Sequence, residues 1–288
     1  MDYFFVILIE ILYSIASLVL IGAGLAIIFG MMKVINLAHG EFMMLGGYVT
    51  ITSVNYGINI FLSILIIAPA TVGLIGLVVE RLVIRNLYSR LVDTMLATWG
   101  LSLFFIGVVT MIFGNTTTGI STPIPGFSIG TYQVGGYNIF IIMISAFLLI
   151  SAYFILKKTR AGLIARGSMQ SAEIASALGY SPDRVYMMTF FCGSALTGLA
   201  GAVLAPLVGL VPSSGGAYIA KAFITVIAGG PSLVVGLVSS ASLFGIVNQL
   251  FTFLYSPVVG EVALLVAAVI LLRLLPRGIT GSFFKDRL

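Results

Sequence analysis

The stretch FGMMKVINLAHGEFMMLGGY, Phe29 to Tyr48, interrupts a long apolar sequence with polar and charged side chains. It contains Lys33, Asn36, the single histidine His39 and Glu41, and apolar segments lie on both sides of it. Inside a membrane, a polar break of this kind is tolerated only where it is buried in protein, lines a water-filled path or lies at the membrane boundary. The stretch therefore predicts a membrane protein whose helices are interrupted at a site that either organises the fold or lines a transport path.

The composition also places the chain among membrane proteins. Of its 288 residues, 60% are hydrophobic and only 8% are charged, whereas soluble domains carry about 25% charged residues. The net charge of +5 does not indicate a nucleic-acid partner, because 12 of the 14 lysines and arginines lie in three clusters beside apolar segments. Such placement is typical of charges that orient a protein in the membrane.

Apolar segments of spanning length recur along the whole chain. A spanning helix needs about 20 apolar residues, and the eight candidate spans are 5–30, 38–56, 58–79, 94–113, 138–156, 186–211, 232–254 and 258–275. A further apolar segment, 217–230, is short and could be a half-helix, a re-entrant piece or a short span. The expected fold is an all-α polytopic membrane helical bundle with eight or nine transmembrane segments, some of them broken or re-entrant. Residues 1–288 are expected to form a single transmembrane domain.

The hydrophilic segments differ in charge. Residues 80–93, residues 157–185 and the C-terminal tail are basic, whereas the loop 114–137 has no charged residue. The basic residues of the tail are Arg273, Arg277, Lys285 and Arg287. Because cytoplasmic loops are enriched in Lys and Arg, the basic segments are expected in the cytoplasm and the uncharged loop outside. The C-terminus is then cytoplasmic and the N-terminus external.

The segment 157–185 is expected to contain a short amphipathic helix. Residues 165–178 include good helix formers, Gly179 is a natural residue to follow a helix, and Ser181-Pro182 stops any continuation. The apolar and the polar residues of this helix lie on different faces, namely Ile174, Ala177 and Leu178 on one, and Arg166, Gln170 and Glu173 on the other.

A second break follows at Gly229, Gly230 and Pro231, which are unfavourable in a helix interior. Two broken segments, one in each half of a chain, point to a transporter built from repeats, although the two halves show no convincing residue-level similarity. Glycines such as Gly198 and Gly201 are more typical of helix-packing surfaces than of a path.

The residues that enzymes use are scarce. One histidine, one cysteine (Cys192) and few carboxylates argue against a metal cluster and against a Cys/His nucleophile pair. His39 and Glu41 are two positions apart and would not face together on a regular helix. No Gly-x-x-x-x-Gly-Lys-Ser/Thr motif occurs, so any ATP that drives transport must be bound by another chain.

A stand-alone transporter or channel is a separate alternative. An ion-coupled carrier would normally hold ionisable residues deep inside its spans, and the only candidates are Glu10, His39, Glu41, Lys221 and Glu261. Most of them lie near predicted boundaries, which disfavours such a carrier but leaves it open. An aquaporin-like channel is disfavoured because the chain has no Asn-Pro dipeptide.

Several motifs resemble one family. INLAHGEFMMLGGY, from Ile35 to Tyr48, resembles the N-terminal signature of branched-chain amino acid ABC transporter permeases, in particular of the shorter permease subunit. The cytoplasmic stretch 166–184 and the small-residue span 190–207 are similar to further blocks of that family. Lys221-Ala222-Phe223 before the double glycine, and Pro276-Arg277-Gly278, match later blocks, so the resemblance covers nearly the whole chain in order.

The chain also departs from the family pattern. Pro231-Ser232-Leu233 follows the double glycine where Leu-Gly-Ser is usual, and Val235-Gly236 replaces a Pro-Gly. Gln170-Ser171 stands where the family commonly has Asn or Asp. These departures leave the substrate open, because related permeases serve urea, short amides and other amino acids as well as branched-chain amino acids.

The resemblance implies a subunit of a type II-like ABC importer in the inner (plasma) membrane of a prokaryote, with no catalytic residue, metal or cofactor of its own. Its partners would be a second homologous permease, two cytoplasmic ABC ATPases that bind ATP and Mg, and an extracytoplasmic substrate-binding protein.

Two groups of residues are the candidate functional sites. The translocation-path candidates are Asn36, His39, Glu41, Gly229 and Gly230. The candidates for ATPase coupling are Arg160, Arg166, Glu173, Gly179 and Arg184. In each case a purely structural role, as a satisfied helix break or as an ordinary solvated helix, is the alternative.

Overall fold

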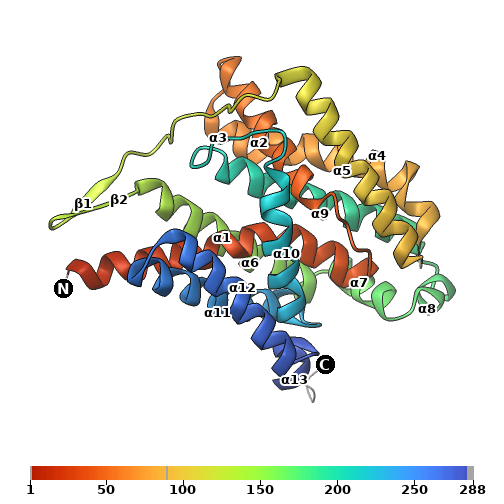
Figure 1. Ribbon diagram of the computed structural model, residues 1–288. Helices are drawn as coiled ribbons and strands as arrows, with labels where there is room; N and C mark the ends of the chain where they lie inside the picture. Colours follow the sequence, from red (N-terminus) through yellow and green to blue (C-terminus); the bar gives the residue numbers. More distant parts are fainter. Residues whose placement is uncertain (1, 89, 284–288) are drawn as a thin grey trace. The chain divides into compact units, whose positions relative to one another are not determined.

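The computed structural model describes residues 2–88 and 90–283, and most of this part of the chain is helical (Figure 1). The helices are α1 (Asp2–Met32), α2 (His39–Asn55), α3 (Ile60–Leu62), η1 (Ser63–Ile67), α4 (Ala68–Leu82), η2 (Ile84–Leu87), α5 (Leu91–Phe113), α6 (Gly136–Lys158), α7 (Arg160–Gln170), α8 (Ala172–Ala177), α9 (Pro182–Leu204), α10 (Gly215–Gly229), α11 (Leu233–Leu254), α12 (Pro257–Leu274) and α13 (Gly278–Phe283). The strands β1 (Phe127–Ile129) and β2 (Tyr132–Val134) form an antiparallel hairpin in which Ser128 pairs with Gln133.

The described residues divide into two compact units. Unit 1 contains the chain up to Gly22, residues 122–150 and the chain from Lys221 onward. Unit 2 contains residues 23–121 and 151–220. The two units are described separately below, and the expectation of a single transmembrane domain stays a prediction.

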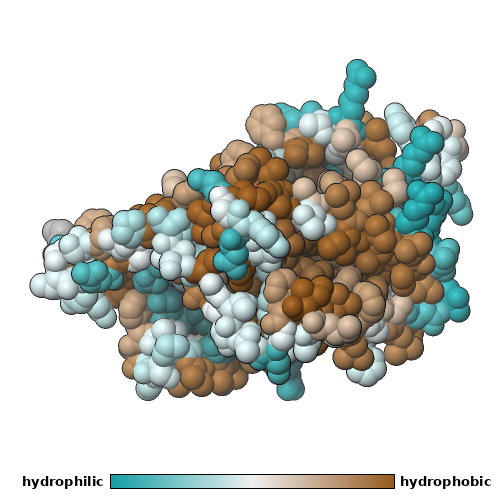
Figure 2. Space-filling view, turned by 90° about the horizontal axis from the view of Figure 1, so that it is seen from above, coloured by the Kyte–Doolittle hydropathy of each residue, from teal (hydrophilic) through white to brown (hydrophobic). Residues whose placement is uncertain are grey.

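Seven helices in the described residues are long and apolar enough to cross a membrane. They are Asp2–Met32, Ile60–Leu82, Leu91–Phe113, Gly136–Lys158, Pro182–Leu204, Leu233–Leu254 and Pro257–Gly281. Hydrophobic side chains cover a broad area of the surface seen in Figure 2. Many large apolar side chains of the described residues are exposed, such as Met111, Phe147 and Val258. The predicted class, a polytopic helical membrane protein, is thereby confirmed.

The predicted number of eight or nine spans is too high. The segment expected at 38–56 forms α2, which has 17 residues and is buried along most of its length. The short apolar segment expected at 217–230 forms α10, which has 15 residues. Because each helical residue adds about 1.5 Å, both helices are shorter than the roughly 30 Å that a spanning helix must cover.

The span Ile60–Leu82 is one helix with a local change of winding. Its first turns, α3, lead into the π turn η1 and then into α4. Ser63 is buried in this turn and its hydroxyl donates to the Asn59 carbonyl oxygen at 3.1 Å. The π turn holds one more residue than an α-helical turn would.

The core of unit 2 is built on close contacts between glycines of neighbouring helices. A Cβ on Gly46 of α2 would overlap the Gly198 carbonyl of α9, and a Cβ on Gly201 of α9 would overlap the Met43 carbonyl of α2. Helix α4 approaches α9 in the same way, where Gly76 lies against Ser194. The prediction that Gly198 and Gly201 form a packing surface is confirmed.

Unit 1 has its own core. One face of α12 is buried and packs on α11, where Gly260 lies against the backbone carbonyl of Asn248. Helix α11 approaches α1 at Gly245 and Ile15. The Asn138 side-chain amide of α6 donates to the Glu10 carboxylate of α1 at 3.1 Å, so a polar contact joins these two helices as well.

The segment 157–185, which the sequence predicts to be cytoplasmic, folds differently from its prediction. Instead of one helix over 165–178, two short helices meet at Ser171, whose backbone is extended at φ −154° and ψ 110°. The Ser171 hydroxyl accepts a hydrogen bond from the Ile174 backbone N–H at 3.2 Å and so caps α8. Gly179 follows α8 at φ +86°, as predicted for a residue after a helix.

We expect Gly46→Ala to destabilise the protein by about 1–3 kcal/mol, because the added methyl group overpacks the contact with Gly198. Thermal unfolding of the purified protein in detergent measures this loss. Gly100→Ala in α5 is the matched control, since a Cβ there meets nothing within 4 Å and alanine favours the helix. Equal unfolding temperatures for the two variants would contradict the packing argument.

Candidate functional site

The polar break lies in unit 2, between the end of α1 and the start of α2. Lys33 adopts φ +55°, which is rare for a residue with a side chain and turns the chain out of α1. The Asn36 side-chain oxygen then accepts a hydrogen bond from the Ala38 backbone N–H at 3.0 Å. The Thr98 hydroxyl of α5 accepts one from the Leu37 backbone N–H, also at 3.0 Å. Side chains thus satisfy backbone groups that the interrupted helix leaves free.

His39 and Glu41 begin α2 and point to different neighbours. His39 is fully buried, and its Nδ1 lies 3.4 Å from the Thr197 hydroxyl of α9. Glu41 is also buried, and its carboxylate lies near the Ser102 side chain of α5. The sequence expectation that the two side chains would not face each other agrees with these partners.

Two buried polar atoms at the break have no hydrogen-bond partner in the described part of the chain. They are the Asn36 side-chain nitrogen and one carboxylate oxygen of Glu41. Buried polar atoms are nearly always hydrogen-bonded, so such atoms indicate contact with water, an ion or a polar ligand. The break therefore keeps hydrogen-bonding capacity that its own fold does not use.

Gly229 and Gly230 lie in unit 1 and have a different environment. Gly230 adopts φ +84°, which ends α10. The Thr280 hydroxyl of α13 donates to the Gly229 carbonyl oxygen at 2.6 Å, and Gly229 packs directly on the Gly236 backbone of α11. The second predicted helix break is therefore present, and α13 stabilises it through the hydrogen bond from Thr280.

The predicted coupling residues all lie on or beside the short helices α7 and α8 and the start of α9. Arg160, Glu173, Gly179 and Arg184 are exposed, and Arg166 is half-buried with its side chain donating to the Gly162 carbonyl oxygen at 3.3 Å. The apolar residues between them are exposed too, namely Leu163, Ile174 and Leu178. The segment thus presents apolar and charged side chains together on an uncovered surface.

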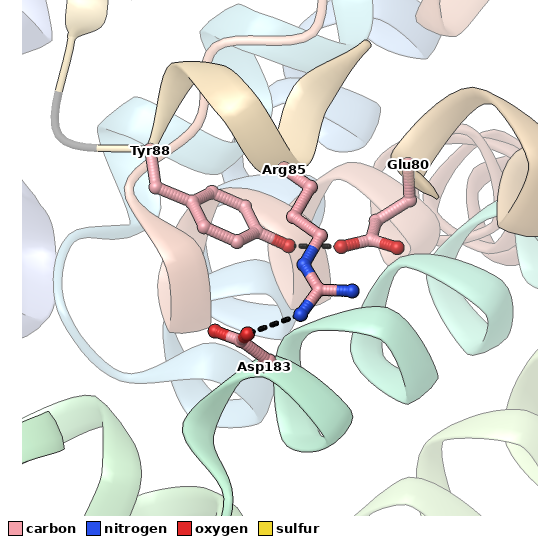
Figure 3. A network of polar contacts seen from close by, with 4 residues as sticks. All are labelled: Glu80, Arg85, Tyr88 and Asp183. Carbon is pink, nitrogen blue, oxygen red and sulfur yellow. Dashed lines mark hydrogen bonds and ion pairs between the residues drawn. The ribbon is translucent and has the colours of Figure 1, made fainter. Parts of the chain in front are cut away.

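A further polar network lies where α9 begins, and the sequence analysis missed it (Figure 3). The Arg85 guanidinium in η2 forms an ion pair with the Asp183 carboxylate in the first turn of α9. The Tyr88 hydroxyl donates to the carboxylate of Glu80 in α4, which is buried. The Arg85–Asp183 pair attaches the connection between α4 and α5 to the start of α9, and the Tyr88–Glu80 contact attaches the same connection to α4.

The two contacts of this network differ in strength. The Arg85–Asp183 pair is half-exposed, and such pairs contribute little to stability; its hydrogen bond and charge raise the pKa of Arg85. Burial, together with the hydrogen bond to Glu80, raises the pKa of Tyr88. The contribution of protonated Tyr88 is therefore complete below the ordinary tyrosine pKa of 10.0 and is lost as the pH rises above it.

Within the described residues, no group of three His, Cys, Asp or Glu side chains could hold a metal ion. The polar groups of the sites are single carboxylates, amides and hydroxyls at helix breaks, and most lie beside membrane-spanning helices. This arrangement defines a class of protein: a polytopic helical membrane protein with buried polar breaks and an exposed polar segment on one side.

Comparison with known proteins identifies the family. The family described as "Branched-chain amino acid transport system / permease component" matches residues 7–275, and the chain belongs to it. The chain is therefore a membrane transport permease, and the family expected from the motifs is confirmed. No solved structure matches the chain.

The relatives are distant in sequence but similar in length. The protein named "Probable branched-chain amino acid transport permease protein LivH" of Methanocaldococcus jannaschii is 29% identical, over 93% of this chain and 90% of the relative. The "High-affinity branched-chain amino acid transport system permease protein LivH" of Escherichia coli K12 is 28% identical, over 91% and 90%. BraD, a permease protein of the same description from Pseudomonas aeruginosa, is 23% identical over 91% of each chain.

Removing the Tyr88 hydroxyl should destabilise the protein, because the buried Glu80 carboxylate loses its donor. We expect Tyr88→Phe to cost about 1–3 kcal/mol, measured by denaturant unfolding of the purified protein at neutral pH. The control is Tyr186→Phe, which removes the hydroxyl of the ring that packs on Tyr88 at a centroid distance of 5.1 Å. A loss as large in the control would contradict the argument, because Tyr186→Phe leaves the hydrogen bond from Tyr88 to Glu80 in place.

Proposed function

We propose that this chain is the membrane-spanning permease subunit of an ATP-binding-cassette importer for branched-chain or related amino acids. An extracytoplasmic binding protein would deliver the substrate, and a second homologous permease would complete the membrane part. Two cytoplasmic ATPase subunits would bind ATP and Mg and supply the energy. The setting is the inner membrane of a prokaryote, with the C-terminus in the cytoplasm.

The observation that carries the proposal is the exposed segment of α7 and α8 with its uncovered apolar residues. Ile174 and Leu178 are more than 60% exposed on a segment rich in charged residues. The sequence places this segment on the cytoplasmic side, where lipid does not cover it. A protein partner on that side accounts for both its apolar and its charged residues.

Helix α9 offers a mechanical connection between the two candidate sites of unit 2. Its first turn follows the coupling segment and holds the Arg85–Asp183 pair. Farther along, its Thr197 lies beside His39 at the polar break. A force applied by an ATPase at α8 would therefore reach the break through one continuous helix.

We further propose that Asn36, His39 and Glu41 border the translocation path. The support is the buried and unused hydrogen-bonding capacity of Asn36 and Glu41. In unit 1, Gly229 and Gly230 would let the backbone bend beside the path, since Gly230 already has a conformation that favours glycine.

The orientation follows from the basic segments. Arg273 lies in the last turn of α12, and Arg277 follows that helix. Lys285 and Arg287, which the sequence analysis also assigned to the cytoplasmic tail, lie outside the described residues.

The coupling role is tested by Gly179→Pro. Proline cannot adopt φ +86° and cannot donate the hydrogen bond from the Gly179 N–H to the Ser176 carbonyl oxygen. We expect the variant to reach the membrane in normal amounts but to lose amino-acid uptake and co-purification of the ATPase.

The control for coupling is Gly167→Ala in α7, where a Cβ meets nothing within 4 Å. It should leave uptake and ATPase binding unchanged. Normal uptake by Gly179→Pro would reject the coupling role. Uptake by the purified wild-type chain without any ATPase would reject the importer proposal as a whole.

The path role is tested by cysteine labelling in a Cys192→Ser background. We expect Asn36→Cys and Glu41→Cys to react with a membrane-impermeant thiol reagent in at least one nucleotide state of the assembled transporter. Phe42→Cys is the control, because Phe42 is buried in the apolar core beside these residues. If positions 36 and 41 stay unreactive from both sides in every state, the break has a structural role alone.

A further inference from the structure

Unit 1 contains one ion pair among the residues that the structure describes. Lys221 of α10 and Glu261 of α12 lie with the ammonium nitrogen 2.6 Å from a carboxylate oxygen. The side chain of Lys221 is 26% exposed and that of Glu261 is 51% exposed. The two side chains therefore form an ion pair but remain partly accessible at the protein surface.

The position of Glu261 along α12 gives the depth that the proposed orientation implies for the pair. Glu261 is one turn from Pro257, where α12 begins, and twelve residues before Arg273 in its last turn. At 1.5 Å per residue, about 18 Å of helix separate the carboxylate from the cytoplasmic end. With Arg273 at the cytoplasmic edge, as proposed above, Glu261 would lie in the outer half of a hydrocarbon layer about 30 Å thick.

An exposed carboxylate at this depth is costly if it faces lipid. Charged side chains inside membranes almost always pair with one another or face a water-filled path, and they mark routes for substrates and ions. The apolar contact of α12 with α11 uses a different set of residues, which includes Gly260, Leu264 and Ala268. The open side of Glu261 is therefore free for a polar neighbour.

We propose that Lys221 and Glu261 form a transient binding site for the zwitterionic head group of an α-amino acid on its way through the membrane. The substrate ammonium would pair with the Glu261 carboxylate, and the substrate carboxylate would pair with the Lys221 ammonium. One internal ion pair is thus exchanged for two pairs with the substrate, and the net charge of the site stays the same. The proposal rests on the proposed function and narrows its substrate class.

The same chemistry discriminates against uncharged solutes. Urea and simple amides carry neither charge and cannot replace the internal partner of either side chain. A compound with a single charge would satisfy one side chain and leave the other unpaired, which is costly inside the apolar layer. The site therefore favours amino acids over urea and short amides, which belong to the substrates that the sequence left open.

Uptake of leucine by the assembled transporter in proteoliposomes tests the site. Glu261→Gln and Lys221→Met should each lower leucine uptake by about tenfold or more, because each leaves one charge unpaired. The exchange variant, Lys221→Glu with Glu261→Lys, restores the ion pair and should reach the membrane normally, but it presents the charges in reversed order. We expect its uptake to stay well below that of the wild type.

The control is Asp93→Asn, which removes the carboxylate of the exposed Arg90–Asp93 pair at the start of α5. It should leave uptake unchanged. Full uptake by the exchange variant would overturn the proposal, because a pair with only a structural role is satisfied in either order. If the wild-type transporter takes up no branched-chain amino acid, this result rejects the proposed function as a whole. Loss of uptake in the variants alone concerns only the site at Lys221 and Glu261.

Chemical labelling gives a readout that does not depend on transport. In a Cys192→Ser background, Glu261→Cys should react with a charged methanethiosulfonate reagent, and leucine should slow the reaction severalfold while leucinamide and 4-methylpentanoate do so less. Val266→Cys, on the same helix and 50% exposed, should be unreactive because lipid excludes the reagent. An unreactive Glu261→Cys, or one that leucine does not protect, would overturn the proposal.

Discussion

Both helix breaks of this protein depend on one constraint. A backbone hydrogen bond that is lost inside a membrane must be replaced within the protein. At the first break, the Asn36 amide and the Thr98 hydroxyl bind the free N–H groups of Ala38 and Leu37. At the second break, the Thr280 hydroxyl binds the Gly229 carbonyl oxygen. Short polar side chains thus make interrupted helices possible in a chain that has very few charges.

Glycine contacts make the first break possible. Because Gly46 and Gly201 let α2 and α9 approach at backbone distance, α2 is surrounded by protein instead of lipid. A helix so enclosed can carry a histidine and a carboxylate at its start, where His39 and Glu41 each find a hydroxyl neighbour. The small residues and the polar residues of the signature are therefore parts of one arrangement, since neither would be stable in the membrane without the other.

Much of this could be predicted from the sequence, because composition and local pattern carry the information. The membrane class follows from the lack of charges, and the first break follows from polar side chains within an apolar sequence. The second break and the turn at Gly179 follow from glycine and proline, which helices disfavour. The number of spans was predicted too high because the segment 38–56 has nearly the length of a span, but α2 ends at Asn55 after 17 residues and is not among the apolar helices of the described residues. The ion pair of Arg85 with Asp183 joins positions that are 98 residues apart. Residue spacing and periodicity predict only local contacts and therefore do not predict this one. Ser171 was missed as a helix boundary because serine is acceptable inside a helix as well as at its start.

The π turn at Ser63–Ile67 affects which deletions the helix Ile60–Leu82 can accept. A π turn stores one residue beyond the number that an α-helix needs for the same rotation. The helix could therefore lose one residue between Ser63 and Ile67 and wind regularly, while Gly73 and Gly76 would still face Phe191 and Ser194 of α9. The loss of a residue within α4 itself would turn these glycines away from α9. The span should therefore tolerate the loss of a residue in this π turn better than within α4.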